Sequence, residues 1–245
     1  MLTMFNLISM RILFFDTETN GLPPRDRSTL ISDVEKWPHI VQLAWQFWDF
    51  TNPDAVCVEN RCGIIKPPET LEWNEVSAGI HGISKAKALE VGVPASELFA
   101  AFVAVASTTN IIVAHNLAFD RSVLKAAMVR ENPSASFLWW PSHDYCTMDS
   151  TKAMCKLPSK SKFPKASDPY KWPTLGELHS FLFGNNDGFK LHSADGDVDC
   201  MVKCFQELVK RRHVPIDTWR RVLASRAAAV AAAAAADKKS EISVN

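Results

Sequence analysis

The sequence has no net charge. Its 245 residues include 27 basic and 27 acidic side chains, so the formal charge at pH 7 is zero. A protein without an overall positive field does not attract long nucleic acid by charge alone. Any attraction of phosphate must therefore come from a local group of side chains. The length allows one sizeable α/β domain or two small ones.

The sequence also lacks cysteine pairs in the Cys-x-x-Cys spacing. Its six cysteines are scattered, which is typical of reduced core residues in an intracellular protein. Cys200 and Cys204 are one helical turn apart. No His or Cys partner lies at zinc-finger spacing from them, so a zinc site is disfavoured.

Long apolar runs are absent as well. No run of eighteen apolar residues occurs, so no transmembrane helix and no membrane partner are expected. Residues 1–10 contain no Lys or Arg and no small-residue cleavage site, which argues against a signal peptide. We expect an intracellular protein, and the sequence does not distinguish cytoplasm from nucleus.

What the sequence does contain is an apolar stretch that ends in two acids. Residues 11–16 are expected to form a strand, and Asp16 and Glu18 are two positions apart, so their side chains would point to the same face. Two like charges about 4 Å apart repel by roughly 4 kcal/mol at an effective dielectric of 20. A fold keeps such a pair when a cation lies between them, and a divalent metal is the obvious candidate.

The rest of the pattern indicates an α/β fold. Further strands are expected at residues 40–48, 56–65 and 111–114, and the short turns between the first three strands indicate an antiparallel part of a mixed sheet. Helices are expected at residues 74–79, 85–89, 94–106, 117–131, 174–183 and 195–212.

Three segments lack a strong pattern. Residues 21–38 are expected to be a loop. Residues 132–173 are rich in Pro and Lys, with a short strand or helix near 145–154, and the remainder is either a solvated loop or a phosphate-contacting flap. Residues 213–245 form a C-terminal extension with a short helix at 214–223 and an Ala-rich end, which we expect to be a fraying helix or a disordered tail.

Two downstream clusters extend the acidic pair. Residues 115–120 follow the short fourth strand and place Asp120 near a helix start; residues 192–197 place Asp197 at the start of the last strong helix. Taken singly, an Asp near a helix start is most often a cap, and His192 alone would most often be a surface histidine.

A calcium loop at the second cluster is excluded. If the loop began at Asp195, Cys200 would stand where an EF-hand needs Gly, and Gln206 where it needs Glu.

In this order the clusters resemble the DEDD exonucleases, which have a ribonuclease H-like fold. Asp16-Thr17-Glu18 resembles the first motif, Asn116 through Phe119-Asp120 the second, and His192-x-Ala194-x-x-Asp197 the third. Histidine five residues before the last Asp is similar to the DEDDh branch, which includes proofreading subunits of bacterial replicases. The tyrosine branch would need Tyr at the position of Ser193. The resemblance covers roughly residues 10–212, the expected exonuclease domain.

The resemblance implies a ribonuclease H-like mixed sheet flanked by helices and a metal-dependent 3′→5′ exonuclease that releases 5′-mononucleotides. Asp16, Glu18, Asp120 and Asp197 would hold two Mg²⁺ or Mn²⁺ ions, with Asp16 shared by both and Asp120 acting mainly through water. His192 would deprotonate the attacking water.

Residues beside the acids are candidates for binding the terminal nucleotide. The resemblance implies this role for Thr17, Thr19 and Asn20. Phe119 would either contact the substrate or pack in the core, and Asn116 would either contact the substrate or pin its loop.

The substrate stays open between two polymers. DNA 3′ ends, single-stranded or frayed, are favoured, and an RNA 3′-end trimmer or oligoribonuclease is the alternative. Proofreading would require a polymerase partner. A non-catalytic nucleic-acid-binding module is disfavoured because all four carboxylates and the histidine are present.

Overall fold

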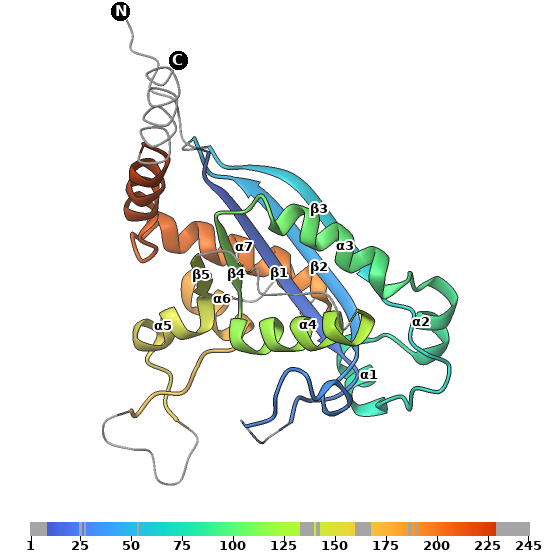
Figure 1. Cartoon of the computed structure of the whole chain (residues 1–245). Coiled ribbons are helices and arrows are strands. Elements are labelled where there is room, and N and C mark those ends of the chain that lie inside the picture. Colours follow the sequence, from blue (N-terminus) through green and yellow to red (C-terminus); the bar gives the residue numbers. More distant parts are fainter. Residues whose placement is uncertain are drawn as a thin grey trace, which may run out of the picture.

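The computed structural model describes residues 9–24, 26, 28–52, 54–132, 140, 143–159, 168–185, 188–189 and 191–228. A five-stranded sheet organises this part of the chain, in the order β3-β2-β1-β4-β5 (Figure 1). The strands are β1 (Arg11–Thr19), β2 (Ile40–Asp49), β3 (Val56–Ile64), β4 (Ile111–Ala114) and β5 (His143–Cys146). The first three are antiparallel neighbours, whereas β4 is parallel to both β1 and β5. The predicted mixed sheet is confirmed.

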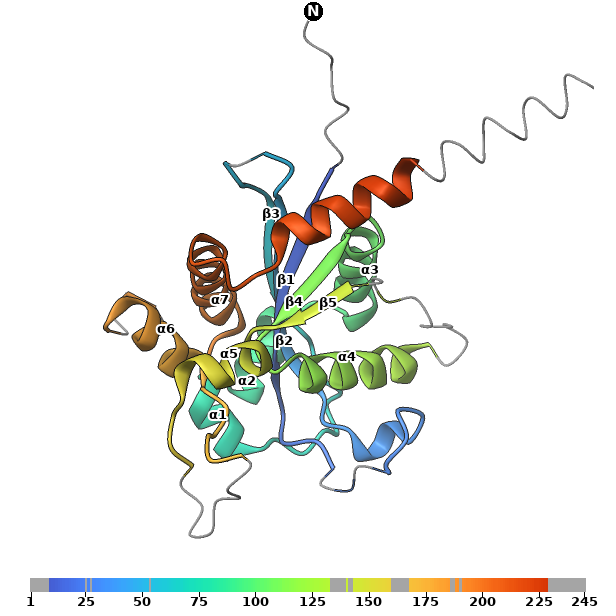
Figure 2. The same ribbon diagram turned by 90° about the vertical axis from the view of Figure 1, so that its left-hand side faces the viewer.

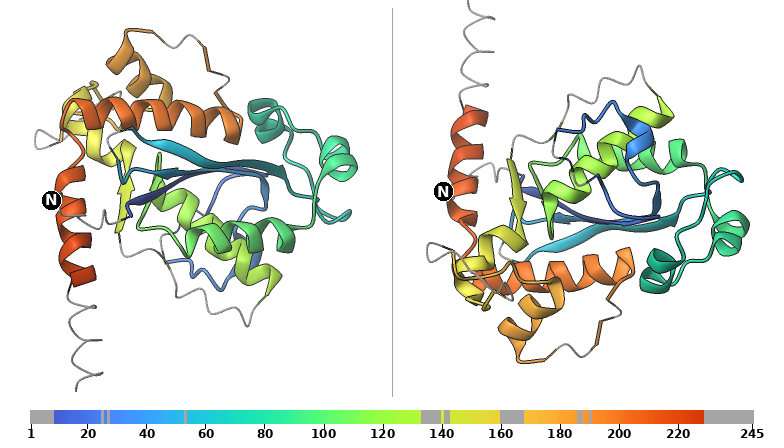
Figure 3. Two further views of the ribbon diagram at one scale, coloured as in Figure 1. Left: turned by 90° about the horizontal axis from the view of Figure 1, so that it is seen from above. Right: turned by 90° about the horizontal axis from the view of Figure 1, so that it is seen from below.

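Helices cover both faces of the sheet, as the two views in Figure 3 show. Strands β1 and β4 therefore carry apolar side chains on both faces, as buried central strands do. The helical segments are η1 (Val34–Lys36), α1 (Glu75–His81), α2 (Lys85–Val91), α3 (Ala95–Ala106), α4 (Leu117–Glu131), α5 (Thr147–Cys155), α6 (Leu175–Phe183) and α7 (Ala194–Lys210).

Strand β1 divides the core by alternation. Ile12 and Phe14 belong to the cluster formed with α6 and α7, and the ring of Phe14 meets that of Phe205 edge-on with centroids 5.0 Å apart. Leu13 and Phe15 belong to the other cluster, formed with α3 and α4. Because side chains alternate along a strand, the residues that follow in β1 are also divided between an α7 side and an α4 side.

Helix ends follow the expected local chemistry. The side chain of Ser84 accepts a hydrogen bond from the backbone N–H of Lys87 at the start of α2. Asn74 caps α1 in the same way, and this helix continues two residues beyond the predicted end, to His81. Helix α3, expected from residue 94, begins one residue later, with Pro94 as its N-cap.

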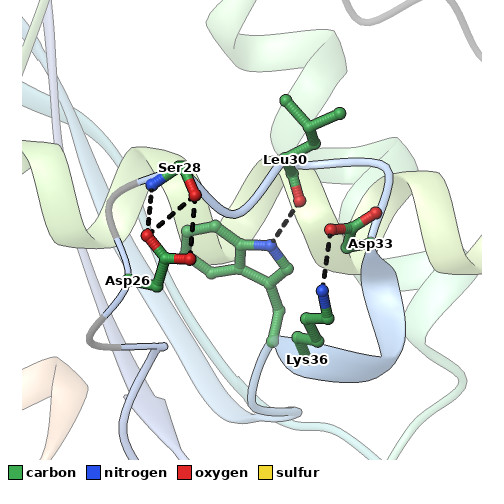
Figure 4. Close-up of polar contacts among 6 residues, drawn as sticks. Asp26, Ser28, Leu30, Asp33 and Lys36 are labelled. Atoms are coloured by element: carbon green, nitrogen blue, oxygen red, sulfur yellow. Dashed lines mark hydrogen bonds and ion pairs between the residues drawn. The ribbon is translucent and has the colours of Figure 1, made fainter.

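The loop after β1 is held by short-range polar contacts (Figure 4). The carboxylate of Asp26 accepts hydrogen bonds from the backbone N–H and the hydroxyl of Ser28. The indole N–H of Trp37 donates to the carbonyl of Leu30. The predicted loop therefore contains local order, including the 3₁₀ turn η1 that the sequence did not indicate.

Residues 216–228 are helical and lie at the end of the sheet where β1 begins (Figure 2). Val214 and Ile216 are buried in the α7-side core, and a guanidinium N–H of Arg220 donates to the carbonyl of Phe50. The first part of the C-terminal extension is thus packed against the core, whereas residues 225–228 are exposed. Most of the Ala-rich stretch, from residue 229 onward, lies outside the described residues.

All six cysteines are unpaired, and Cys200 and Cys204 are fully buried in the core. Among the described residues, no helix is both long enough and apolar enough to cross a membrane.

Candidate active site

The site lies at the C-terminal end of β1. Asp16 and Glu18 follow Phe14 on the α7 side of the strand by alternation, and Asp197 comes from the first turn of α7. One carboxylate oxygen from each of these three residues lies within 4.8 Å of the other two. Strand periodicity thus pairs two acids, and α7 packing brings the third to them.

The fourth predicted acid comes from the other face. Asp120 lies in the first turn of α4 and is 2% exposed. Its carboxylate accepts hydrogen bonds from the hydroxyl of Thr17, at 2.7 Å, and from the Thr17 backbone N–H, at 3.2 Å. Thr17 points to the α4 side because it alternates with Asp16 and Glu18. Asp120 therefore borders the three-acid cluster through its contact with β1.

The start of α7 is built around a strained residue. His192 is exposed and has φ of 66°, a left-handed conformation that non-glycine residues rarely adopt. Its backbone N–H donates to both carboxylate oxygens of Asp197, at 3.3 and 3.2 Å. The N–H of Ala194 donates to the side-chain oxygen of Gln42 on β2, 3.0 Å away. These bonds tie the third motif to the sheet and fix the orientation of Asp197.

Burial raises the pKa of every acid in this group, and the charges of neighbouring acidic side chains add to the shift. Burial is the main cause at Asp16, whose pKa lies well above its usual range, and the charges of Asp120, Asp197 and Glu18 raise it further. Burial, together with the charge of Asp197, raises the pKa of Glu18 to about 7. Burial raises the pKa of Asp120 to about 7 against the opposing hydrogen bonds from Thr17. Burial also raises the pKa of Asp197 to about 6, although the N–H of His192 opposes the shift.

The four acids share one open cleft with a volume of about 610 Å³. Eight of the ten predicted site residues line this cleft: Asp16, Thr17, Glu18, Asn116, Phe119, Asp120, His192 and Asp197. Phe119 also packs partly against the core on the α4 side of the sheet. Its position is therefore compatible with both expected roles, substrate contact and core packing. Asn116 adopts a left-handed conformation with φ of 72° and precedes α4 as its N-cap, which turns the chain from β4 into the helix.

Thr19 and Asn20 do not line the cleft. The hydroxyl of Thr19 donates to the carbonyl of Gly21 at 2.7 Å. The amide of Asn20 donates to the carbonyl of Glu72, and its oxygen accepts from the N–H of Asn74. Both side chains hold the chain that leaves β1, and their role toward a substrate stays a prediction.

His115 also lines the cleft, although the three motifs assign it no role. Its Nε2 lies 3.0 Å from the carbonyl oxygen of Pro173, which can only accept, so the neutral ring donates there. Its Nδ1 lies 3.0 Å from the hydroxyl of Thr147. Burial lowers the pKa of His115 to about 4. The residue joins the second motif to the segment before α6.

The segment before α6 forms part of the cleft wall that the sequence did not indicate. Trp172 and Pro173 line it together with the first turn of α6. The sequence offered only proline and lysine content in this region, which does not indicate which side chain faces an acidic site. Helix α6 begins at a capping box formed by Thr174 and Glu177.

The donor set suits a hard divalent cation. Carboxylate oxygens are the preferred protein ligands of Mg²⁺ and Mn²⁺. Buried acids with raised pKa values gain most from a cation that replaces their protons. Asp16, Glu18 and Asp197 would hold such an ion together, and Asp120 could contribute to a second.

Comparison with known proteins identifies the fold. No model of a protein family matches the sequence, and no curated protein matches it. Escherichia coli exonuclease I in its zinc-bound complex with single-stranded DNA has a TM-score of 0.59 and 19% identity over 85% of this chain. Exonuclease I from Methylocaldum szegediense has a TM-score of 0.59 and 18% identity over 82% of this chain. Escherichia coli exonuclease I with a dT13 oligonucleotide has a TM-score of 0.60 and 20% identity over 85% of this chain.

These matches span 42%, 41% and 43% of the respective exonuclease I chains, about two fifths of their length. At this level of identity the likeness shows the architecture. The predicted ribonuclease H-like α/β fold, a mixed sheet flanked by helices, is therefore confirmed.

Proposed function

We propose that this chain is a metal-dependent 3′→5′ exonuclease of the DEDDh type. It would hydrolyse phosphodiester bonds at nucleic-acid 3′ ends, with DNA as the favoured substrate, and release 5′-mononucleotides. The observation that carries the proposal is the convergence of Asp16, Glu18 and Asp197 within 4.8 Å in an open cleft. The similarity in fold to exonuclease I supports the same reading.

Each acid has a role in this proposal. Asp16, Glu18 and Asp197 would hold one Mg²⁺ or Mn²⁺ ion, and Asp16 with Asp120 would hold a second. Bound ions would supply positive charge that stabilises both the attacking and the leaving oxygen of an in-line displacement at phosphorus. Thr17 orients the Asp120 carboxylate through two hydrogen bonds, so this acid would already be in position before an ion binds.

His192 is the proposed general base. It lies on the cleft wall and is exposed, so its ring can reach water. A neutral imidazole nitrogen can accept a proton from water. The left-handed backbone of His192 and the hydrogen bonds from its N–H to Asp197 fix the direction in which the side chain leaves the backbone. His192 would take the proton from the attacking water.

The terminal nucleotide would lie against the remaining cleft residues. Thr17, Asn116 and Phe119 are the proposed contacts within the cleft. Thr19 and Asn20 shape the loop beside it. The expected domain, residues 10–212, contains all of these residues.

The test is nucleotide release by the purified protein. Single-stranded DNA and RNA of equal length are incubated with Mg²⁺, Mn²⁺ or EDTA, and products are resolved by length. We expect stepwise loss of 5′-mononucleotides from the 3′ end of DNA, and no activity in EDTA. Asp16→Asn should lower the rate by at least about a hundredfold, because the carboxylate that faces the other three acids is lost.

The matched control is Asp195→Asn. Asp195 is an exposed carboxylate in the same first turn of α7, and it does not line the cleft. Its substitution should leave the rate within about twofold, since exposed changes away from a site have small effects. Full activity of Asp16→Asn would overturn the proposed mechanism. Faster release from RNA than from DNA would assign the alternative substrate.

A further inference from the structure

The most exposed aromatic ring on the cleft wall belongs to Trp172. This side chain is 51% exposed although indole is largely apolar, and it lines the same cleft as the four acids. Large apolar side chains usually lie inside a protein. An indole left open beside a phosphodiesterase-like acidic site is therefore a candidate contact for a substrate.

The backbone on both sides of Trp172 is fixed. The N–H of Lys171 donates to the carbonyl of Leu157 at 2.9 Å, and Tyr170 pairs with Pro158 in an antiparallel bridge. On the other side the carbonyl of Pro173 is bound by His115. A side chain on a fixed backbone loses less conformational freedom on binding than one on a mobile segment, which favours recognition.

One face of the ring is already occupied. The ammonium nitrogen of Lys152, on α5, lies 4.1 Å from the centre of the Trp172 ring, and it also pairs with Asp168 at 2.6 Å. A cation can cover only one face of an aromatic ring at this distance. The exposed area of the ring is therefore offered on the remaining face and edges, toward the cleft that it lines.

We propose that Trp172 is a stacking platform for an unpaired nucleobase near the scissile end, so that the substrate class is single-stranded nucleic acid. The proposal rests on the proposed function for the identity of the polymer. Stacking needs a base whose face is free, which a base inside a duplex does not offer. It also accounts for affinity in a protein without net positive charge, because aromatic stacking adds to the local phosphate contacts. Trp172 would position the strand rather than take part in bond cleavage.

The test measures binding apart from hydrolysis. Fluorescence anisotropy of a 5′-labelled twelve-nucleotide DNA strand is recorded in EDTA for the full chain and its variants. We expect Trp172→Ala and Trp172→Leu to raise Kd by about tenfold, and Trp172→Phe to stay within about threefold because the ring is kept. In Mg²⁺ the same loss should be found in KM, with kcat changed much less.

Phe181→Ala is the matched control. Phe181 is a second exposed aromatic, 43% exposed on the neighbouring helix α6, but it does not line the cleft. Its removal should leave Kd unchanged. A blunt duplex of the same sequence should bind the unsubstituted protein at least about tenfold more weakly than the single strand. The Leu and Phe variants decide the question if the Ala variant does not fold.

Two results would overturn the proposal. One is equal Kd for the Leu and Phe variants and the unsubstituted protein, and the other is equal affinity for single strand and duplex. Failure of the proposed function has a different pattern. In that case the unsubstituted protein would bind the strand through Trp172 and release no nucleotide with either metal.

Discussion

At the scale of single residues, His115 connects the chemistry of the cleft to the stability of the fold. It is buried between Thr147 and Pro173, and both ring nitrogens have partners when the ring is neutral. Burial lowers its pKa from 6.5 to about 4. The folded protein therefore excludes a proton that the unfolded chain binds between these two pH values.

This difference predicts acid sensitivity. Because the unfolded chain binds more protons between pH 6.5 and 4, the contribution of His115 is fully present above pH 6.5 and is lost as the pH falls toward 4. His115→Gln removes this titration. The unfolding free energy of the unsubstituted protein, measured in urea, should fall relative to that of His115→Gln by about 2–3 kcal/mol from pH 7 to pH 4.5. A constant difference between the two proteins across this range would contradict the neutral, buried assignment.

The residues of the candidate site differ in how far the sequence reveals them. Asp16 and Glu18 were found from spacing alone, since the two-residue period of a strand places both on one face. Asp120 and Asp197 needed the order of three motifs, because an acid at a helix start is usually only a cap. Trp172 carried no signal. The position of Trp172 depends on the pairing of residues 157–158 with residues 170–171. Such pairing is decided by tertiary contacts and not by a local sequence pattern.

At the scale of elements, the first turn of α6 holds one wall of the cleft. The hydroxyl of Thr174 accepts from the N–H of Glu177 at 3.2 Å, and the carboxylate of Glu177 accepts from the N–H of Thr174 at 2.9 Å. Glu177 is also paired with Lys171 at 2.5 Å, and these contacts lower the pKa of its carboxyl, with the Lys171 hydrogen bond as the main cause. The helix start and the segment before it are therefore one unit.

We expect Thr174→Ala to lower the unfolding free energy by about 1 kcal/mol, because a helix N–H and the reciprocal bond lose their geometry. In a chain of this size that corresponds to a fall of about 2–4 °C in melting temperature. Thr174→Ser keeps the hydroxyl and should retain most of the stability. Equal melting temperatures for the Ala variant and the unsubstituted protein would show that the cap contributes nothing.

The elements themselves were largely predictable. Periodicity identified strands β1 to β4 and helices α1 to α4, α6 and α7 to within about three residues. Strand β5 and helix α5 were predicted only as a short strand or helix near residues 145–154. The partners and the direction of β4 in the sheet were not predictable. Residues 111–114 form a short apolar run, and only the crossover that makes them parallel to β1 brings the second motif beside the first. The order of the motifs in the sequence therefore identified the site residues, and the parallel pairing of β4 with β1 explains why they come together in space.

At the scale of the whole molecule, the four acids impose a pH dependence opposite to that of His115. Their pKa values are raised in the folded protein, to about 7 for Glu18 and Asp120 and about 6 for Asp197. Between about pH 4 and 7 the metal-free folded state holds protons that the unfolded chain has released. Its stability from these groups is thus present at low pH and is lost as the pH rises through 7. Loss of this contribution at neutral pH is the energetic reason to expect a cation there.

A divalent ion should therefore stabilise the protein most where the acids are ionised. Ligand carboxylates must lose their protons before they bind metal, so the apparent affinity for Mn²⁺ should be at least about tenfold weaker at pH 5.5 than at pH 8. The rise in melting temperature with 1 mM Mn²⁺ should accordingly be larger at pH 8. Calorimetric titration at pH 7 in two buffers of different ionisation enthalpy should register proton release on binding. Asp16→Asn removes the acid that interacts with the other three, and it should abolish both the temperature shift and the proton release. A metal-induced shift of equal size at both pH values, or one retained in Asp16→Asn, would place the cation elsewhere on the molecule.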